Sequence, residues 1–262
     1  MKRLFLLFLA FPLIGNGQSN AVLSDLMGTS SSENRTLAET QVHGFVQRLK
    51  LQNTRSEIVF LRKVFHQTQR TFLNQYDPYS EFNELFTAGK YDCLTATALF
   101  SLVLDKLNFK YNIIETNYHI FVMVNTSRGE VLLETTDRFN GFVRNAKEIQ
   151  ERIGTYRQGV TAGTTANRQI YRYHFDLYHT VSPNQLPGLL YYNLAVKAYN
   201  EGSLEKCAEL LVKAKAVYDS PRIGEFSLIF LRSVAASKMD DQTKQRILVQ
   251  FKNLRPPVLA SR

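Results

Sequence analysis

The chain has 262 residues, of which 44% are hydrophobic and 21% charged, and its formal net charge is +9. This balance is typical of a globular protein with an ample core in one or two domains, and it argues against a disordered chain. Lysine and arginine form no dense block and no nucleic-acid-binding motif occurs, so we expect a mildly basic surface and no nucleic-acid partner.

Residues 1–17 are typical of a secretory signal peptide. Lys2 and Arg3 form its charged start, residues 4–14 are its apolar segment, and small residues suited to cleavage before Gln18 follow. The alternative is an uncleaved membrane anchor, but the apolar run is shorter than the about 20 residues that cross a bilayer. We therefore expect an exported protein, periplasmic or secreted, with a net charge of +7 and no stable membrane span after signal removal.

Three segments follow the signal peptide. Residues 18–35 are polar and small, which predicts a mobile leader. Residues 36–51 and 56–72 carry apolar side chains at helical spacings, which predicts two helices. His43 and His66 lie on these helices among polar neighbours, and we interpret both as surface histidines rather than ligands.

A cysteine lies at the start of the next predicted helix. A turn at Gly89 leads straight into an apolar helix over residues 93–107, so Cys93 falls in its first turn. Asp92 is a suitable N-cap residue for this helix. Unpaired backbone N–H groups and the positive end of the helix dipole favour an anion there. Cys93 is therefore a candidate thiolate nucleophile.

A small antiparallel sheet is predicted after this helix. Residues 111–115 and 118–124 are rich in β-branched and aromatic side chains, which indicates two strands. A turn at Gly129 then leads to a returning strand over residues 131–134.

Two polar groups occupy the ends of these strands. His119 begins the second strand, and Glu134 ends the returning one. A thiol, a histidine and a carboxylate on neighbouring elements are the parts of a nucleophile, its base and the group that orients the base. Asp137, three residues beyond Glu134, is the alternative acid.

These residues resemble the transglutaminase-like branch of the papain-type thiol enzymes, and most closely its prokaryotic SirB1-type members. The resemblance rests on residues 89–107, 119–124 and 132–136 in that order, in the middle third of the chain. It implies an α+β fold, with a transglutaminase-like domain over residues 36–187 whose cysteine-bearing helix packs on a small antiparallel sheet. It also implies a Cys-His-Glu/Asp triad that acts on amide bonds, with no cofactor and no metal.

The chain departs from the family pattern at two points. Glu134 stands where the family has aspartate, and the sequence has no tryptophan, which many members place near the cysteine to support the oxyanion. The backbone N–H of Cys93 is the expected oxyanion donor, because it comes with the helix start. Tyr76, Asn83 and Tyr91 are side-chain alternatives.

The chain beyond the triad begins with a predicted helix over residues 146–153 and a polar loop over residues 154–166. Residues 169–180 alternate in part, which indicates an edge strand or an irregular arm. His174 and His179 would lie on opposite faces of such a strand, so we expect no metal pair.

The sequence pattern of residues 188–262 is typical of helices. Helices are expected from residue 189 and over residues 204–217, 226–236 and 242–251, and the first pair resembles a tetratricopeptide hairpin. So few repeats would not stand alone, and we expect them to dock on the thiol domain. Plain helical packing and a partner-binding role remain open for them.

Cys207 lies within a helical pattern, and we interpret it as a buried structural thiol. Because the protein is expected to be exported, a Cys93–Cys207 disulfide is the alternative to a reactive Cys93.

The favoured hypothesis is an exported thiol hydrolase (a cysteine peptidase or amidase) or acyl-transferase. Its substrate would be a protein or peptide, with cell-envelope material as one candidate. The alternative is a catalytically inactive binding module that works through its C-terminal helices.

Overall fold

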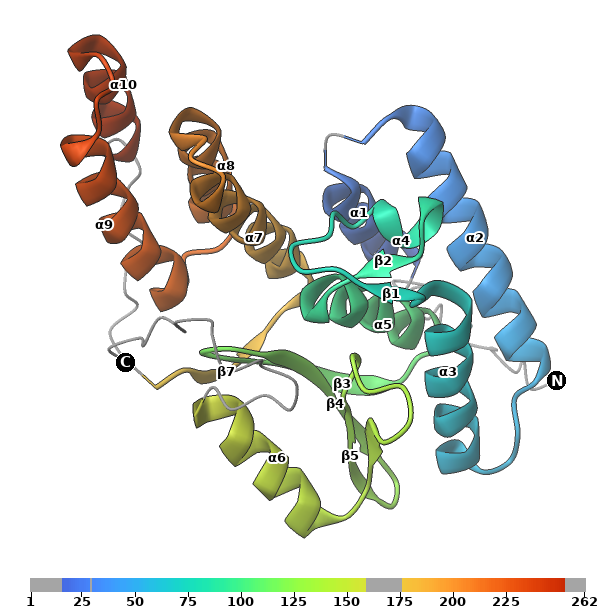
Figure 1. The fold of residues 1–262 in the computed structure, drawn as a ribbon. Coiled ribbons are helices and arrows are strands. Elements are labelled where there is room, and N and C mark those ends of the chain that lie inside the picture. Colours follow the sequence, from blue (N-terminus) through green and yellow to red (C-terminus); the bar gives the residue numbers. More distant parts are fainter. Residues whose placement is uncertain (1–15, 29, 159–175, 253–262) are drawn as a thin grey trace, which may run out of the picture.

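The structure is a computed structural model that describes residues 16–28, 30–158 and 176–252 (Figure 1). The side chains of residues 16–20 are excluded from that description. The predicted signal segment up to residue 15, most of the predicted polar loop and His174 lie outside the described residues.

A five-stranded antiparallel sheet with the strand order β6-β5-β4-β3-β7 forms the centre of the molecule. Its strands are β3 (Lys110–Thr116), β4 (Ile120–Thr126), β5 (Gly129–Leu133), β6 (Phe142–Val143) and β7 (Tyr178–Val181). The β3–β4–β5 meander is the predicted sheet. Strand β7 overlaps the end of the segment over residues 169–180 that was predicted as an edge strand or an irregular arm, of which residues 169–175 lie outside the described ranges. The mixed helix-and-sheet architecture agrees with the predicted α+β class.

Helix α5 (Cys93–Lys106) lies on one face of the sheet and α6 (Ala146–Gln158) on the other (Figure 1). Every residue of α5 from Leu94 to Leu104 is buried. The reason is its surroundings: α5 packs on β3 and β4 and is also contacted by α1, α2 and α7. A helix that is apolar all round is stable only in such a position. The fold thus fixes α5, and Cys93 with it, against the sheet.

In the described residues before α5 there are four helices and a short parallel ribbon. The helices are α1 (Asn16–Met27), α2 (Ser32–Leu51), α3 (Glu57–Phe72) and α4 (Glu84–Thr87), and the ribbon pairs β1 (Gln75–Tyr76) with β2 (Lys90–Tyr91). The sequence predicted α2 and α3 but not the ribbon, whose strands of two residues carry no periodicity. Gly89 permits this ribbon, since a Cβ there would lie 2.3 Å from the Asn74 side chain.

The prediction of a mobile leader over residues 18–35 is wrong for the described part of that segment. The segment holds α1 and the first turn of α2. Val22, Leu23 and Leu26 on α1 are at most 5% exposed, and α1 packs against α5 and α7. The prediction was wrong because the segment is polar on average, although a few of its apolar residues recur at helical spacing.

The C-terminal helices are α7 (Leu186–Asn200), α8 (Leu204–Val217), α9 (Pro221–Ala236) and α10 (Asp241–Lys252), after the short 3₁₀ helix η1 (Pro183–Gln185). Leu186, Leu189 and Ala195 of α7 are buried in the core that contains α5. The predicted docking on the rest of the chain is therefore confirmed, while α9 and α10 lie farther out (Figure 1). Among the described helices, none has the length and apolar character needed to cross a bilayer.

Candidate functional site

Cys93 occupies the first turn of α5, as predicted, and its side chain is partly exposed. Asp92 caps the helix: its Oδ1 accepts a hydrogen bond from the Thr95 N–H at 2.8 Å, and the Asp92 N–H donates to the Thr95 hydroxyl at 2.8 Å. This reciprocal capping box satisfies two backbone donors and fixes the direction of the helix start. Burial raises the pKa of the Asp92 carboxyl, while the hydrogen bonds from Thr95 oppose that shift.

His119 is held by the turn between β3 and β4. Its N–H donates to the Thr116 hydroxyl at 3.0 Å, and its carbonyl accepts from the Thr116 N–H at 2.8 Å. The Thr116 hydroxyl also lies 3.2 Å from the carbonyl of Tyr156, to which it can donate. His119 is 7% exposed, so its ring is fixed in a largely water-free position.

Glu134, directly after β5, binds the His119 ring. The Glu134 Oε2 lies 2.6 Å from His119 Nε2. Its Oε1 accepts from the Thr136 N–H at 3.0 Å and from the Thr136 hydroxyl at 2.6 Å. Glu134 is 4% exposed, and these partners satisfy both of its oxygens.

Asp137, the alternative acid, has other partners. Its Oδ1 accepts from the N–H groups of Phe139 and Asn140, and its Oδ2 lies 3.4 Å from Arg152. It therefore organises the turn after β5. Of the two alternatives that the sequence left open, the structure places Glu134 on the His119 ring.

The Cys93 thiol lies within electrostatic reach of the His119 side chain. Because Nε2 faces Glu134, Nδ1 is the ring nitrogen left for the sulfur. Burial alone would lower the pKa of His119, but the Glu134 carboxylate, which is hydrogen-bonded to the ring, and the interaction with Cys93 raise it to about 10. Burial opposes ionisation of Glu134 too, yet His119 and Thr136 lower its pKa. At neutral pH the pair is therefore an imidazolium and a carboxylate.

Threonines join α5 to the strand ends that carry the histidine and the acid. The Thr97 hydroxyl lies 3.1 Å from the Thr135 hydroxyl and 3.3 Å from the Ile120 carbonyl. Gln69 on α3 donates to the Thr135 carbonyl at 2.7 Å. The sequence analysis missed these contacts, although polar side chains within an otherwise apolar helix were a usable signal.

Tyr156 is a further member of the site that the sequence analysis missed. Its ring centroid lies 4.6 Å from that of His119, and its hydroxyl is within electrostatic reach of Glu134 and Arg152. Burial and the Glu134 charge both raise the pKa of Tyr156. The predicted helix ended at residue 153, one turn too early to bring this side chain to the histidine.

The three side-chain alternatives for an oxyanion donor have different environments. Tyr76 is 52% exposed, and partial burial of its hydroxyl together with the charges of Cys93 and Asp92 raises its pKa, which places it within electrostatic reach of the thiol. Tyr91 packs edge-on against Tyr76 with centroids 5.7 Å apart. Asn83 instead lines a small pocket beside α1 and α7.

Gly141 closes the loop that follows Glu134. Its N–H donates to the Asp137 carbonyl at 3.0 Å, and its carbonyl accepts from the Glu134 N–H at 2.8 Å. A Cβ at this position would lie 2.3 Å from each of the Asp137 and Glu134 carbonyl oxygens. Only glycine fits without displacing the loop that carries the acid.

The second cysteine, Cys207 on α8, is fully buried, and burial raises its pKa to about 12. Both cysteines are free, so the alternative of a Cys93–Cys207 disulfide is not realised. The expectation that Cys207 is a buried thiol is confirmed.

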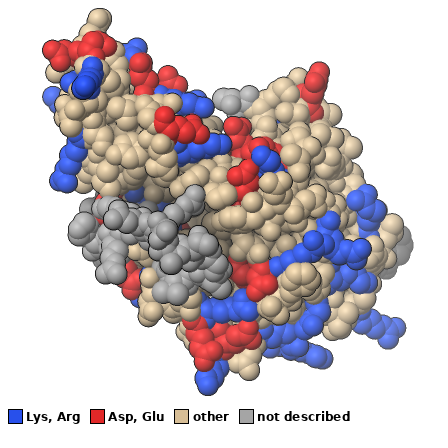
Figure 2. Space-filling view, viewed as in Figure 1, with Lys and Arg blue, Asp and Glu red and all other residues tan. Residues whose placement is uncertain are grey.

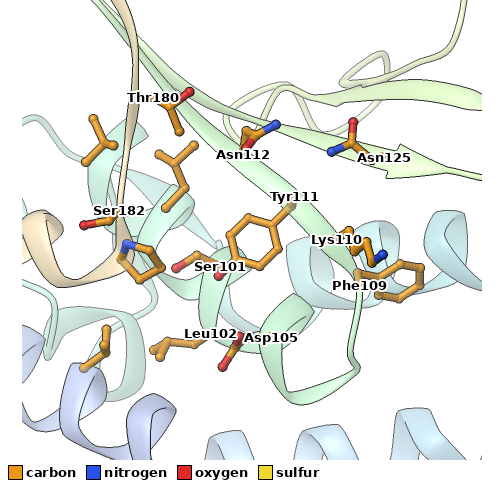
Figure 3. A pocket seen from close by; sticks show the side chains of 14 residues that line it. Ser101, Leu102, Asp105, Phe109, Lys110, Tyr111, Asn112, Asn125, Thr180 and Ser182 are labelled. Atoms are coloured by element: carbon orange, nitrogen blue, oxygen red, sulfur yellow. The ribbon is translucent and has the colours of Figure 1, made fainter. Parts of the chain in front are cut away.

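A pocket of about 600 Å³ lies apart from the triad (Figure 3). Its lining includes Ser101, Leu102 and Asp105, which lie roughly 12 to 18 Å further along α5 than Cys93. The Tyr111 ring lies beside Ser101 (Figure 3).

The other described histidines include His43 and His66 on the N-terminal helices. His43 is exposed, as predicted, whereas His66 is half-buried and burial lowers its pKa. Within the described ranges, no three potential metal-ligating side chains come together. On the face seen in Figure 2, basic side chains lie among acidic ones and large uncharged areas.

In comparisons with known proteins, the chain matches no protein-family model, no curated protein and no solved structure.

Proposed function

We propose that this protein is a transglutaminase-like thiol enzyme that acts on an amide or ester carbonyl, with a protein or peptide as its substrate. The observation that carries the proposal is the arrangement around His119. One side of its ring binds the buried Glu134 carboxylate, and the ring is also within electrostatic reach of a partly exposed thiol at a helix start.

The reaction would begin with attack of the Cys93 thiolate on the carbonyl carbon. The first-turn N–H groups of α5, with that of Cys93 foremost, would stabilise the negative charge that develops on the carbonyl oxygen. Collapse of this adduct breaks the carbon–nitrogen bond, and the His119 imidazolium gives its proton to the departing amine. The product of this half-reaction is a thioester on Cys93 and a neutral imidazole.

The second half-reaction releases the acyl group. Water attacks the thioester while His119 takes its proton, which regenerates the thiolate–imidazolium pair and a free acid. An amine acceptor would give transfer instead of hydrolysis. Hydrolysis is the default, because Cys93 is partly exposed and water is the most concentrated nucleophile. Glu134 keeps the ring oriented throughout.

Thiol alkylation tests this proposal. At pH 7, iodoacetamide should modify one cysteine faster than it modifies the thiols of the denatured protein, and peptide mapping should identify that cysteine as Cys93. The fast phase should disappear in Cys93→Ala and persist in Cys207→Ala. A native Cys93 that reacts no faster than in the denatured chain would refute the proposal.

The alternative, an inactive binding module, has one observation in its favour. Apolar side chains on the outer helices are exposed, among them Leu228 on α9 at 60% and Val249 on α10 at 51%. These helices could hold a protein partner whether or not the thiol is active. Export of the protein and the tetratricopeptide-like character of the helices belong to the same proposal, and cell-envelope material fits it as a substrate.

A further inference from the structure

Two hydrogen bonds join the C-terminal helices to the candidate site. One reaches the residue that precedes Cys93, and the other reaches a residue that is hydrogen-bonded to His119. The first is on α7, where the Asn193 amide donates to Asp92 Oδ2 at 3.1 Å. The other oxygen of Asp92 caps α5. Asn193 therefore braces the residue that sets the position of Cys93.

The second contact comes from α9. The Arg222 guanidinium donates to the carbonyl of Thr116. The hydroxyl of the same threonine accepts from the His119 N–H, and its N–H donates to the His119 carbonyl. Arg222 is thus linked through one residue to the backbone that carries the imidazole.

Arg222 is itself anchored in a buried cluster. Its Nε lies 3.3 Å from Oε1 of Glu115, a β3 residue whose side chain is fully buried. The Tyr218 hydroxyl donates to the other Glu115 oxygen at 3.0 Å, and His179 Nε2 lies 3.4 Å from that oxygen. The guanidinium also lies 5.9 Å from the Tyr192 ring centroid. A cation held on so many sides has little freedom to move.

We infer that Asn193 and Arg222 are positioning residues, through which the C-terminal helices hold Cys93 and His119 in reacting distance. Cys93 is carried by α5 and His119 by the sheet, so their separation depends on how those two layers are held. Helix α7 contacts the first layer and α9 the second, and they are joined through α8. The helical region is then part of the catalytic unit rather than an appended binding module. This inference rests on the proposed function.

The test compares four variants of the full-length protein. Asn193→Leu removes the amide, Arg222→Met removes the guanidinium, and Arg222→Lys keeps the charge. The matched control is Arg246→Met, which breaks the exposed ion pair between Arg246 on α10 and Glu205 on α8. The measured quantity is the rate of Cys93 alkylation between pH 5 and 10, with circular dichroism as the check of folding.

Asn193→Leu and Arg222→Met should each slow alkylation at pH 7 by about fivefold or more, the size expected for one lost hydrogen bond. Their pH profiles should shift toward higher pH, in the direction of the His119→Ala profile. Arg222→Lys should recover part of the loss, and Arg246→Met should match the wild type. A merely structural role would lower the melting temperature and leave the profile of the folded protein unchanged.

Wild-type profiles in folded Asn193→Leu and Arg222→Met would overturn the inference. Arg222→Met leaves the buried Glu115 carboxylate without its cation and could therefore fail to fold. In that case the double variant Glu115→Gln/Arg222→Met removes the carboxylate charge as well. Asn193→Leu tests the inference independently of this cluster. Failure of the proposed function gives a different result: the wild-type Cys93 itself would show no enhanced reactivity.

Discussion

Two cysteines in this protein carry the same functional group in opposite environments. Cys93 is partly exposed at the start of α5 and within electrostatic reach of a histidine, whereas Cys207 is fully buried within α8. Burial alone raises the pKa of Cys207 to about 12. The comparison teaches that the surrounding backbone and side chains, rather than the thiol itself, decide which cysteine can act as a nucleophile.

The substitution expected to change the reactivity of Cys93 most is His119→Ala. Without the imidazole, Cys93 loses the nearby group that is proposed to activate it. We expect its alkylation at pH 7 to slow by about a hundredfold or more, the range typical of a general base. Stopped-flow alkylation with peptide mapping measures this. A loss of less than threefold would show that the histidine does not activate the thiol.

The next largest effect is expected from Glu134→Gln. Without the carboxylate, burial would dominate and lower the pKa of His119, so the ring would be neutral at pH 7. Loss of a charge-assisted hydrogen bond corresponds to a factor of about ten to a hundred in rate. The same alkylation assay applies, with Asp137→Asn as the control. A larger effect of Asp137→Asn than of Glu134→Gln would reverse the assignment of the acid.

The same pair predicts how stability depends on pH. The folded pKa of His119 is raised from 6.5 to about 10, so its stabilisation is complete below pH 6.5 and is lost as the pH rises toward 10. The lowered pKa of Glu134 adds stabilisation that is complete above pH 4.5 and is lost in acid. Thermal melts should therefore show a plateau between pH 4.5 and 6.5 and a decline toward pH 10 that is reduced in His119→Gln. Identical alkaline declines in the two proteins would contradict this.

A smaller effect is expected from Tyr156→Phe. The change keeps the ring that packs against His119 and removes the hydroxyl that interacts with Glu134. Loss of a polar interaction worth about 1 kcal/mol, the size of a typical hydrogen bond, should slow alkylation about fivefold. Tyr156→Leu, which removes the ring as well, should be slower still. Equal rates in wild type and Tyr156→Phe would mean that only the ring matters.

The smallest effect on Cys93 is expected from Cys207→Ser. A hydroxyl in place of this fully buried thiol should destabilise the fold by about 1–3 kcal/mol. The alkylation rate of Cys93 in the folded protein should stay at the wild-type value. Urea denaturation and alkylation measured in parallel check both statements, and a slowed Cys93 would show that the two thiols are coupled.

Structural features that depend only on contiguous residues could be predicted from the sequence. The start of α5 at Cys93, its cap at Asp92 and the β3–β4–β5 meander all follow from local periodicity and capping chemistry. The choice between Glu134 and Asp137 could not, because both follow the same strand. Side-chain hydrogen bonds decide it, and these depend on the turn closed by Gly141.

Contacts between segments that are far apart in the sequence could not be predicted from local sequence patterns. Tyr156 reaches His119 only because α6 continues for another turn. Asn193 lies 101 residues from Asp92, and Arg222 lies 106 residues from Thr116. Neither of these side chains stands out within an ordinary helical sequence, so only the packing of the helices on the sheet identifies it.

The most direct measurement of the central claim is to trap the acyl-enzyme. The full-length protein is mixed with p-nitrophenyl acetate, quenched in acid within the first turnover and mapped by peptide mass spectrometry. The account predicts an acetyl group on the Cys93 peptide, with a burst of nitrophenol that disappears in Cys93→Ala and is strongly reduced in His119→Ala. An unlabelled Cys93, or a burst that survives the loss of His119, would contradict it.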